Sequence, residues 1–283
     1  MIGVMRSMGL GRRVRWVAAF TVAAVLLAAL AWFPLGPYRG EVPVPEGIVD
    51  MHCHVAGIGA GGSGCFVCDE LRASWKFGVF LRGFGITEKE LEAGGDRIVP
   101  DRISKMLAGS RYVRKAVILA IDGVAAPDGT LDRGRTQLYV PNEFVADAAA
   151  RHPNLLFGAS VNPYRRDALE RLDWAAAHGA VLVKWIPSIM DIDPADPELE
   201  PFYRRLAALD LPLLTHGGKE RALAASRDEY CDPEKLRLPL SLGVRVIVAH
   251  VASTGRHGGE ADMRRLARMM REYPDLFADI SSL

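Results

Sequence analysis

The chain has 283 residues, of which 49% are hydrophobic and 24% are charged, so it can bury a large core and is not expected to be disordered. Its 35 basic and 34 acidic side chains leave a formal net charge of +1, which excludes a general attraction to nucleic acid or to acidic surfaces. The length fits one large α/β domain.

The amino-terminal region predicts a membrane-targeting segment. Residues 1–15 contain four arginines, and residues 16–33 form an uncharged, mainly apolar run of eighteen residues. Such a run is about long enough to cross ~30 Å of hydrocarbon. It is either a retained transmembrane anchor, favoured by its length and flanking aromatic residues, or a signal segment cut near residues 29–31. In both cases we expect the rest of the chain to be exported to the periplasm or the exterior, anchored to the membrane or secreted.

The folded domain is expected to span residues 44–283, after a linker rich in proline and glycine at residues 34–43. Its first strand, residues 48–54, is a short apolar run that ends in His52 and His54. Side chains two residues apart on a strand share a face, so both imidazoles can reach one metal ion while Cys53 points away. Two unrelated surface histidines would give the same pattern, so later segments must decide.

The next part of the chain is an insertion before the second strand. Residues 56–64 are glycine-rich and predict a loop whose backbone can approach a ligand. Cys65 and Cys68 form a C-x-x-C pair, which suits a disulfide, a redox pair or half of a zinc site, but no second such pair exists and we favour a structural or incidental role. Residues 69–114 carry helical patterns, with a capping box at Thr87 and Glu90, and would form a lid or a wall over the site.

Strand and helix patterns then alternate regularly. Six further apolar runs lie at residues 116–121, 155–161, 181–186, 211–216, 244–250 and 276–280, separated by helical patterns. Such alternation predicts a parallel sheet with crossover helices. A doubly wound sheet would gather its ligand groups at one switch point, whereas histidines here end strands one, five and six. We therefore predict an α/β fold of the (β/α)8 TIM-barrel-like type, lacking its eighth strand because only seven can be counted.

Two of these later strands also end in histidines, namely His216 and His250. Catalytic groups collect at the carboxyl edge of parallel strands. We therefore expect the four histidines to lie together at that edge of the sheet. Three imidazoles on one ion would leave a position open for water, whose pKa the metal lowers. We predict His52, His54 and His216 as the metal ligands and His250 as the catalytic proton shuttle.

Lys184 lies inside the apolar run of the fourth strand. A buried lysine is costly unless it is paired or modified. It is a candidate for binding a substrate carboxylate or for bridging metals as a carbamate, and the alternative is a lysine that extends to the barrel mouth.

Together these motifs resemble the amidohydrolase superfamily, and more narrowly its amidohydrolase-related branch, which includes aminocarboxymuconate-semialdehyde decarboxylase-like enzymes. The resemblance covers about residues 44–283 and rests on the His-x-His strand, Lys184, Leu214-Thr215-His216-Gly217-Gly218 and Val248-Ala249-His250. It implies a divalent ion, usually zinc, held by His52, His54 and His216, with His250 as the catalytic histidine. It also implies an aspartate at the end of strand eight, which this sequence does not reach. Asp279 matches the seventh strand, so we do not give it that role.

Three functions remain open at this stage. The favoured one is a metal-dependent hydrolase that acts on an amide, ester or lactone bond of a small molecule. The second is a metal-dependent decarboxylase of a carboxylated small molecule. The third is a truncated, inactive barrel, since the missing strand would impair activity. The sequence indicates a small-molecule substrate and a membrane contact, no nucleic acid, and no particular oligomeric state.

Overall fold

A computed structural model describes residues 47–224 and 227–281. Contacts divide the chain into Met1–Val44 and Pro45–Leu283. The predicted basic segment, membrane-targeting segment and linker (residues 1–43) lie outside the described residues. Among the helices that the structure describes, none has the length and apolar character needed to cross a membrane.

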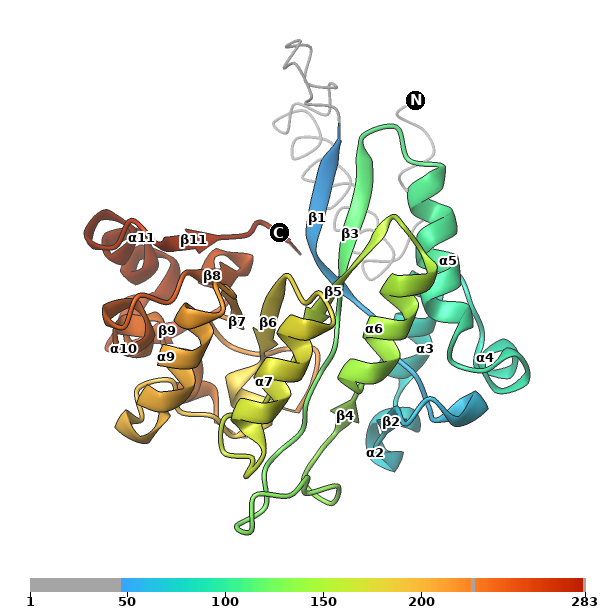
Figure 1. Cartoon of the computed structure of the whole chain (residues 1–283), viewed down its shortest axis with the longest axis horizontal. Coiled ribbons are helices and arrows are strands. Elements are labelled where there is room, and N and C mark those ends of the chain that lie inside the picture. The colour runs from blue at the N-terminus through green and yellow to red at the C-terminus, as the bar shows by residue number, and fades with distance from the viewer. Residues whose placement is uncertain (1–46, 225–226, 282–283) are drawn as a thin grey trace, which may run out of the picture. The chain divides into compact units, whose positions relative to one another are not determined.

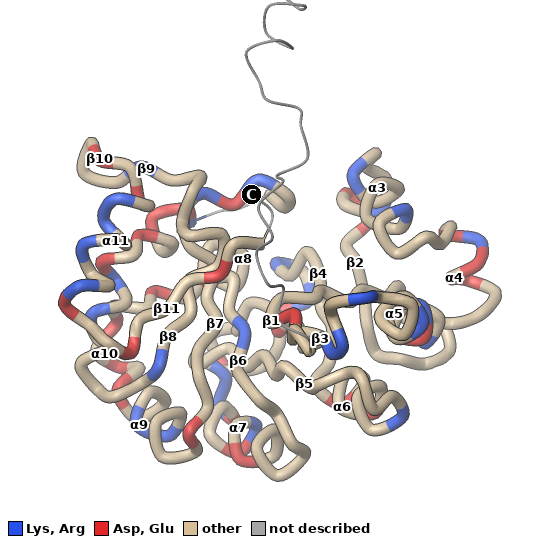
Figure 2. The backbone as a smooth tube through the Cα atoms, turned by 90° about the horizontal axis from the view of Figure 1, so that it is seen from above, with Lys and Arg blue, Asp and Glu red and all other residues tan. Residues whose placement is uncertain are grey.

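Seven parallel strands form one sheet in the order β1-β3-β5-β6-β7-β8-β11. Their bounds are β1 Ile48–His54, β3 Val113–Leu119, β5 Leu155–Ala159, β6 Leu182–Trp185, β7 Leu213–His216, β8 Val246–Ala249 and β11 Leu276–Ala278. All seven predicted strands are present and lie side by side in chain order. The sheet curls into an arc (Figure 2), and this α/β arrangement fits a TIM-barrel-like fold. In the described part of the chain β1 and β11 are the two edges and do not pair with each other.

Helices connect the strands and lie on the outer side of the arc, as Figures 1 and 2 show. The longer ones are α5 Ile98–Ala108, α6 Asn142–Arg151, α7 Ala168–Ala177, α9 Glu200–Ala208 and α11 Asp262–Glu272. Shorter ones are α8 Pro187–Met190 and α10 Arg237–Ser241. The predicted segment 165–178 begins its helix three residues late, at Ala168, because a turn after Asn162 precedes it.

The two faces of the sheet bury different apolar clusters. Val117, Leu119, Leu182, Leu214 and Ala249 form a small cluster on the inner face of the arc, and the neighbouring strand residues pack into the large cluster under the helices. Both faces of the central strands β5, β6, β7 and β8 are largely buried, which explains why these strands are continuous apolar runs rather than alternating ones. Because side chains alternate along a strand, Lys184 shares a face with Leu182, and His216 shares one with Leu214. The inner cluster therefore forms the floor below both residues.

The insertion is helical, as predicted, but it ends earlier. Its helices are α2 Asp69–Arg72, α3 Trp75–Gly83, α4 Glu88–Gly94 and α5, and β3 begins at Val113 instead of residue 116. Thr87 and Glu90 form the predicted capping box at the start of α4. Nζ of Lys76 on α3 donates to the carbonyls of Arg221 and Ala222 at 3.1 Å, so the insertion contacts the loop after β7.

Two short pairings were not predicted. β2 Phe66–Val67 pairs with β4 Leu138–Tyr139, and β9 Arg256–His257 pairs with β10 Glu260–Ala261, both antiparallel. Each strand has only two residues, too few to leave an alternating pattern in the sequence. The first pairing joins the end of the glycine-rich loop to the segment before α6.

Candidate metal centre

Polar side chains from five strands meet at the carboxyl edge of the sheet. They are His52 and His54 of β1, Lys184 of β6, His216 of β7, His250 directly after β8, and Asp279 directly after β11. The fold therefore places the four histidines at one edge of the sheet, as predicted, and Lys184 joins them there. The reason is the parallel arrangement, which places the end of every strand at the same edge.

Both ring nitrogens of His52 have partners. Nδ1 lies 2.8 Å from Oδ2 of Asp279, and since a carboxylate can only accept, this contact assigns the ring proton to Nδ1. Nε2 then carries the lone pair, and it lies 3.0 Å from Nε2 of His54 and 3.1 Å from Nζ of Lys184. The lone pair of His52 thus points into the centre of the cluster.

Asp279 receives several hydrogen bonds. Burial raises its pKa, but hydrogen bonds from His52, from the backbone N–H of His250 at 2.9 Å and from Ser281 outweigh burial and hold the pKa well below its usual range. Asp279 is therefore ionised near neutral pH and can keep the Nδ1 proton of His52 in place.

His54 and His216 are both poor bases in this environment. Burial lowers the pKa of His54 well below its usual value, with the Lys184 charge acting in the same direction. Burial also lowers the pKa of His216 to about 4, although the nearby Glu220 carboxylate opposes it. Nδ1 of His54 and Nε2 of His216 have no hydrogen-bond partner among the described residues. Both rings are neutral near pH 7, the form that binds metal ions.

Lys184 is buried at 1% exposure on β6. Burial lowers the pKa of its ammonium group to about 8, against the opposing charges of Asp279 and Glu220. Its Nζ lies within the histidine cluster, 3.1 Å from Nε2 of His52.

His250 has a strained backbone. Its φ is 58°, and Val251 and Ala252 follow with φ of 45° and 51°, a left-handed conformation that a β-branched residue adopts rarely. The turn is held by the hydrogen bond from the His250 N–H to Asp279 and by one from Val251 N–H to the Asp279 carbonyl at 3.0 Å. Strain of this kind persists where surrounding contacts over-determine it, and it commonly occurs at functional sites.

The ring of His250 lies between the other histidines. It stacks on His52 with centroids 5.0 Å apart and meets His216 edge-on at 5.2 Å. Its Nδ1 lies 2.8 Å from the carbonyl oxygen of Ser281 and 2.9 Å from the Ser281 hydroxyl. A carbonyl can only accept, so this contact assigns a proton to Nδ1 and leaves Nε2 for other chemistry.

This donor set of imidazoles and a carboxylate fits a divalent metal ion. Metal-binding histidines usually donate their second ring N–H to a carboxylate or carbonyl, as His52 does to Asp279. The Nε2 atoms of His52 and His54 converge, and Nε2 of His216 is buried without a hydrogen-bond partner among the described residues. One ligand atom each from His52, His250 and Asp279 also lie within 4.8 Å of one another, a tight group that His54 and His216 do not join.

Three polar partners in this cluster were given no role from the sequence. Ser281 contacts both His52 and His250, Glu220 lies 3.6 Å from Nε2 of His216, and Asp279 holds His52 and the backbone of His250. Asp279 and Ser281 have the same two-residue spacing after an apolar strand as His52 and His54, a signal that could have found them. Asp279 sits at the seventh strand, as predicted, and its carboxylate orients a histidine.

The glycine-rich loop after β1 is tied to the insertion by one buried residue. Asp96 accepts hydrogen bonds from the backbone N–H of Ile58 at 3.0 Å and of Gly59 at 2.9 Å, and from the hydroxyl of Ser63. A Cβ on Gly57 would lie 2.3 Å from Oδ2 of Asp96, so this position requires glycine. The loop is thus ordered and is held directly beyond His54.

The four cysteines are free thiols, and Cys65 and Cys68 do not form a disulfide. Cys65 is buried, and its burial raises the pKa of the thiol to about 12. Cys68 precedes α2 and is partly exposed. Neither thiol lies in the histidine cluster.

A second group of potential ligands consists of Asp232, His257 and Asp262. Nδ1 of His257 is 2.9 Å from both carboxylate oxygens of Asp262, and Arg265 donates to both oxygens of Asp232 at 2.9 Å. These pairs already satisfy the carboxylates, so the group is a polar network that joins α11 to the segments beside it.

Comparison with known proteins identifies a family for this chain. The family model described as Amidohydrolase matches residues 49–283. No curated protein sequence matches the chain. Among solved structures, a protein from Lactobacillus casei described as a metal-dependent hydrolase has 14% identity and a TM-score of 0.46, over 84% of this chain and 74% of its own.

Two further structures have similar values. One is described as a 2-pyrone-4,6-dicarboxylic acid hydrolase from Pseudomonas putida, with 14% identity and a TM-score of 0.43 over 81% of this chain and 67% of its own. The other is 5-carboxyvanillate decarboxylase from Novosphingobium aromaticivorans with bound manganese, with 14% identity and a TM-score of 0.41 over 81% of this chain and 72% of its own.

Proposed function

Because the chain belongs to the amidohydrolase family, whose members generally depend on a divalent metal, we propose that it is a metal-dependent hydrolase of an amide, ester or lactone bond in a small molecule. We propose zinc as the ion and His52, His54 and His216 as its ligands. The observation that carries the proposal is the fixed orientation of His52, whose protonated Nδ1 faces Asp279 while Nε2 faces Nε2 of His54.

Each residue of the centre has a separate role in the proposed reaction. A bound divalent ion supplies Lewis acidity to a substrate carbonyl and a more acidic water. Asp279 keeps His52 in one tautomer and orientation, so it is a positioning residue. His250, whose Nδ1 is tied to the Ser281 carbonyl at 2.8 Å, is placed to take a proton at Nε2 and return it to the leaving group. The inner apolar cluster excludes water from below.

A metal-dependent decarboxylase is the second candidate, and Lys184 favours it. Its buried Nζ lies 3.1 Å from Nε2 of His52, so a cation is available at the centre for a substrate carboxylate. Analysis of the products separates the two reactions, because only the decarboxylase releases carbon dioxide. An inactive scaffold is the third possibility, and metal content tests it.

The proposal predicts that protein purified without chelator contains a divalent metal, most of it zinc. Removing a direct ligand should cost more than the ~10–100-fold in affinity that loss of a ligand's hydrogen-bond partner typically costs. The variant His52→Ala/His54→Ala should therefore be free of metal by elemental analysis and inactive on 4-nitrophenyl esters and simple lactones. Chelation followed by added zinc should abolish and then restore wild-type turnover.

His178→Ala is the matched control, since His178 is exposed and stacks on Trp174, away from the centre. It should retain the metal and turnover of the wild type. Wild-type protein without metal, or equal metal in the double variant, would overturn the metal assignment. Metal without hydrolysis but with release of carbon dioxide would select the decarboxylase.

A further inference from the structure

Glu220 is a buried carboxylate beside the histidine cluster, and the proposed function gives it no role. It lies in the loop after β7, four residues beyond His216, and is 8% exposed. Its Oε1 accepts hydrogen bonds from the backbone N–H groups of Ala222 at 2.5 Å and Leu223 at 3.2 Å. Its Oε2 lies 3.6 Å from Nε2 of His216. One oxygen is therefore bound to the loop, and the other faces a proposed metal ligand.

The separation between Oε2 of Glu220 and Nε2 of His216 does not suit a direct hydrogen bond. At 3.6 Å it is longer than an N–H···O hydrogen bond, which spans about 2.7–3.2 Å. Nε2 is also buried without a hydrogen-bond partner among the described residues. A buried imidazole nitrogen that faces a carboxylate oxygen in this way stays unsatisfied, which costs free energy unless a cation binds both groups.

The same separation suits two ligands of one metal ion. Zinc binds imidazole nitrogen and carboxylate oxygen at about 2.0–2.2 Å, so two ligand atoms of a tetrahedral ion lie about 3.3–3.6 Å apart. The 3.6 Å between Oε2 of Glu220 and Nε2 of His216 is at the upper end of that range. The Nε2 atoms of His52 and His54 have a comparable separation of 3.0 Å. Glu220 and His216 thus have the spacing that a shared ion requires.

The loop after β7 holds Glu220 in this position. Gly218 has a φ of 79°, and a Cβ at this residue would lie 2.9 Å from Oγ1 of Thr254, so the turn requires glycine. The Gly218 N–H donates to the Cys231 carbonyl at 3.1 Å, and Oγ1 of Thr254 donates to the Lys219 carbonyl at 2.8 Å. The turn is therefore fixed from two neighbouring segments, and it brings the Glu220 carboxylate back beside the end of β7.

The negative charge of Glu220 acts on the centre of the cluster. Burial lowers the pKa values of Lys184 and His216, and the charge of Glu220 opposes this effect at both groups. Asp279, the other carboxylate of the cluster, is already bound by hydrogen bonds from His52 and from its chain neighbours. Oε2 of Glu220 is therefore the carboxylate oxygen that remains for an ion.

We propose that Glu220 is an anionic ligand of the bound metal ion, which it binds through Oε2 beside Nε2 of His216. The inference rests on the proposed function for the presence of the ion. It adds a ligand that neither the sequence motifs nor the family resemblance assigned. The three proposed imidazole ligands are neutral, so Glu220 adds a negative charge to a ligand set that otherwise has none. That charge offsets part of the cost of burying a divalent cation.

The test compares Glu220→Gln with the wild type after metal has been removed by chelation. Glutamine keeps Oε1 as the acceptor for the N–H groups of Ala222 and Leu223, so the metal-free proteins should unfold at the same temperature. Zinc affinity, measured by competition with a coloured chelator, should fall about 100-fold or more, because a direct ligand is lost. The rise in melting temperature that zinc gives the wild type should shrink accordingly.

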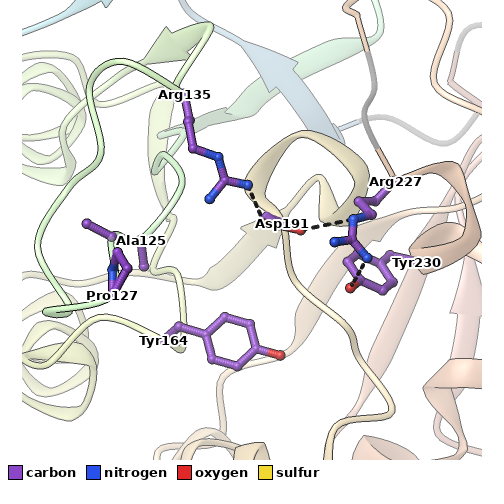
Figure 3. Close-up of a pocket in the computed structure, with 8 residues that line it drawn as sticks. Ala125, Pro127, Arg135, Tyr164, Asp191, Arg227 and Tyr230 are labelled. Atoms are coloured by element: carbon purple, nitrogen blue, oxygen red, sulfur yellow. Dashed lines mark hydrogen bonds and ion pairs between the residues drawn. The ribbon is translucent and has the colours of Figure 1, made fainter.

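Asp191→Asn is the matched control, because it also removes one acid from a loop at the carboxyl edge of the sheet. Oδ2 of Asp191 accepts a hydrogen bond from Nη2 of Arg135 at 2.6 Å, and Oδ1 lies 3.7 Å from Nε of Arg227 (Figure 3). These residues line a polar cavity whose lining includes none of the clustered histidines. Asparagine tolerates the left-handed φ of 55° at this position, so zinc affinity should equal that of the wild type.

Two spectroscopic measurements separate a metal ligand from a residue that only positions one. With excess cobalt as the probe, Glu220→Gln should change the visible absorption of the bound ion, since ligand type and geometry determine that spectrum, and Asp191→Asn should not. In wild-type protein labelled with carbon-13 at its glutamate carboxylates, zinc should shift a carboxylate stretching band in the infrared difference spectrum. The label distinguishes Glu220 from Asp279, and this measurement does not depend on the folding of a variant.

Failure of this inference differs from failure of the proposed function. Wild-type protein that binds no divalent metal would overturn both. Wild-type protein that binds zinc without a shifted glutamate band, or Glu220→Gln protein with wild-type zinc affinity or an unchanged cobalt spectrum, would overturn the role of Glu220 alone. A shifted glutamate band in the wild type, with weaker zinc binding and a changed cobalt spectrum in Glu220→Gln, is the expected result.

Discussion

At the scale of single residues, the centre depends on how hydrogen bonds set the state of each imidazole. Nδ1 of His52 keeps its proton because it donates to Asp279 at 2.8 Å. Nδ1 of His250 keeps its proton because it donates to the Ser281 carbonyl, also at 2.8 Å. Asp279 is the link between them, because its other oxygen accepts from the backbone N–H of His250 at 2.9 Å. One carboxylate thus orients a proposed ligand and fixes the strained turn of the proposed proton shuttle.

The first prediction at this scale concerns Asp279→Asn. The amide cannot accept from His52 and from the His250 backbone with the strength of a carboxylate, so His52 loses its preferred tautomer. We expect metal affinity to fall by ~10–100-fold, the usual cost of losing a ligand's carboxylate partner, measured by competition with a coloured chelator. Asp275→Asn, on an exposed residue just before β11, is the control and should bind metal normally. Wild-type affinity in Asp279→Asn would show that Asp279 does not position His52.

At the scale of elements, the site depends on how the glycine-rich loop is anchored. Asp96 precedes α5 and is fully buried, and it binds two backbone N–H groups and one hydroxyl of the loop that follows β1. The helical insertion is thereby connected to the strand that ends in His54. At its other side, α3 reaches the loop after β7 through Lys76, so the insertion contacts both flanks of the centre.

The second prediction tests this anchor with Asp96→Asn, which keeps the shape of the side chain but replaces one acceptor by a donor that faces the loop. Hydrogen bonds to charged groups are worth ~1.5–3 kcal/mol, so the free energy of unfolding in urea should fall by about that amount. Asp101→Asn on the exposed side of α5 removes only surface pairs with Arg151 and His152 and should cost ~1 kcal/mol or less. Equal effects of the two changes would contradict the anchoring role of Asp96.

At the scale of the whole molecule, the described sheet has two open edges that are bridged by side chains. β1 and β11 share no backbone ladder within the described residues, yet His52 of β1 contacts Asp279 and Ser281, which follow β11. The polar cluster therefore occupies the place where the two edge strands approach each other. Its contacts hold the first and last strands of the arc together as well as shaping the site.

The third prediction concerns the topology of the full chain, for which residues 1–33 are the evidence. Four arginines precede the uncharged run and none lies within it, so the amino terminus should stay in the cytoplasm and the barrel should be exported. Alkaline phosphatase fused after Gly40 should be active, and a cytoplasmic reporter fused at the same place should not. Activity of the cytoplasmic reporter alone would reverse the assignment.

The sequence by itself determined the seven strands of the main sheet, their order and the edge at which four histidines lie. Buried parallel strands must be continuous apolar runs, and the side-chain period of two places His52 with His54, so both features are visible locally. The capping box at Thr87 and Glu90 was visible for the same reason, since its partners are three residues apart. Such signals need no knowledge of distant residues.

Only the tertiary structure decided which groups meet. His52 and Asp279 are 227 positions apart, and Arg135 and Asp191 are 56 apart, so no local pattern relates them. The burial that lowers the pKa values of His216 and Lys184, and the contacts that force His250 into a left-handed turn, are properties of neighbours from other strands. A strand's sequence determines at which end and on which face its side chains lie. The tertiary fold determines which partners contact those side chains.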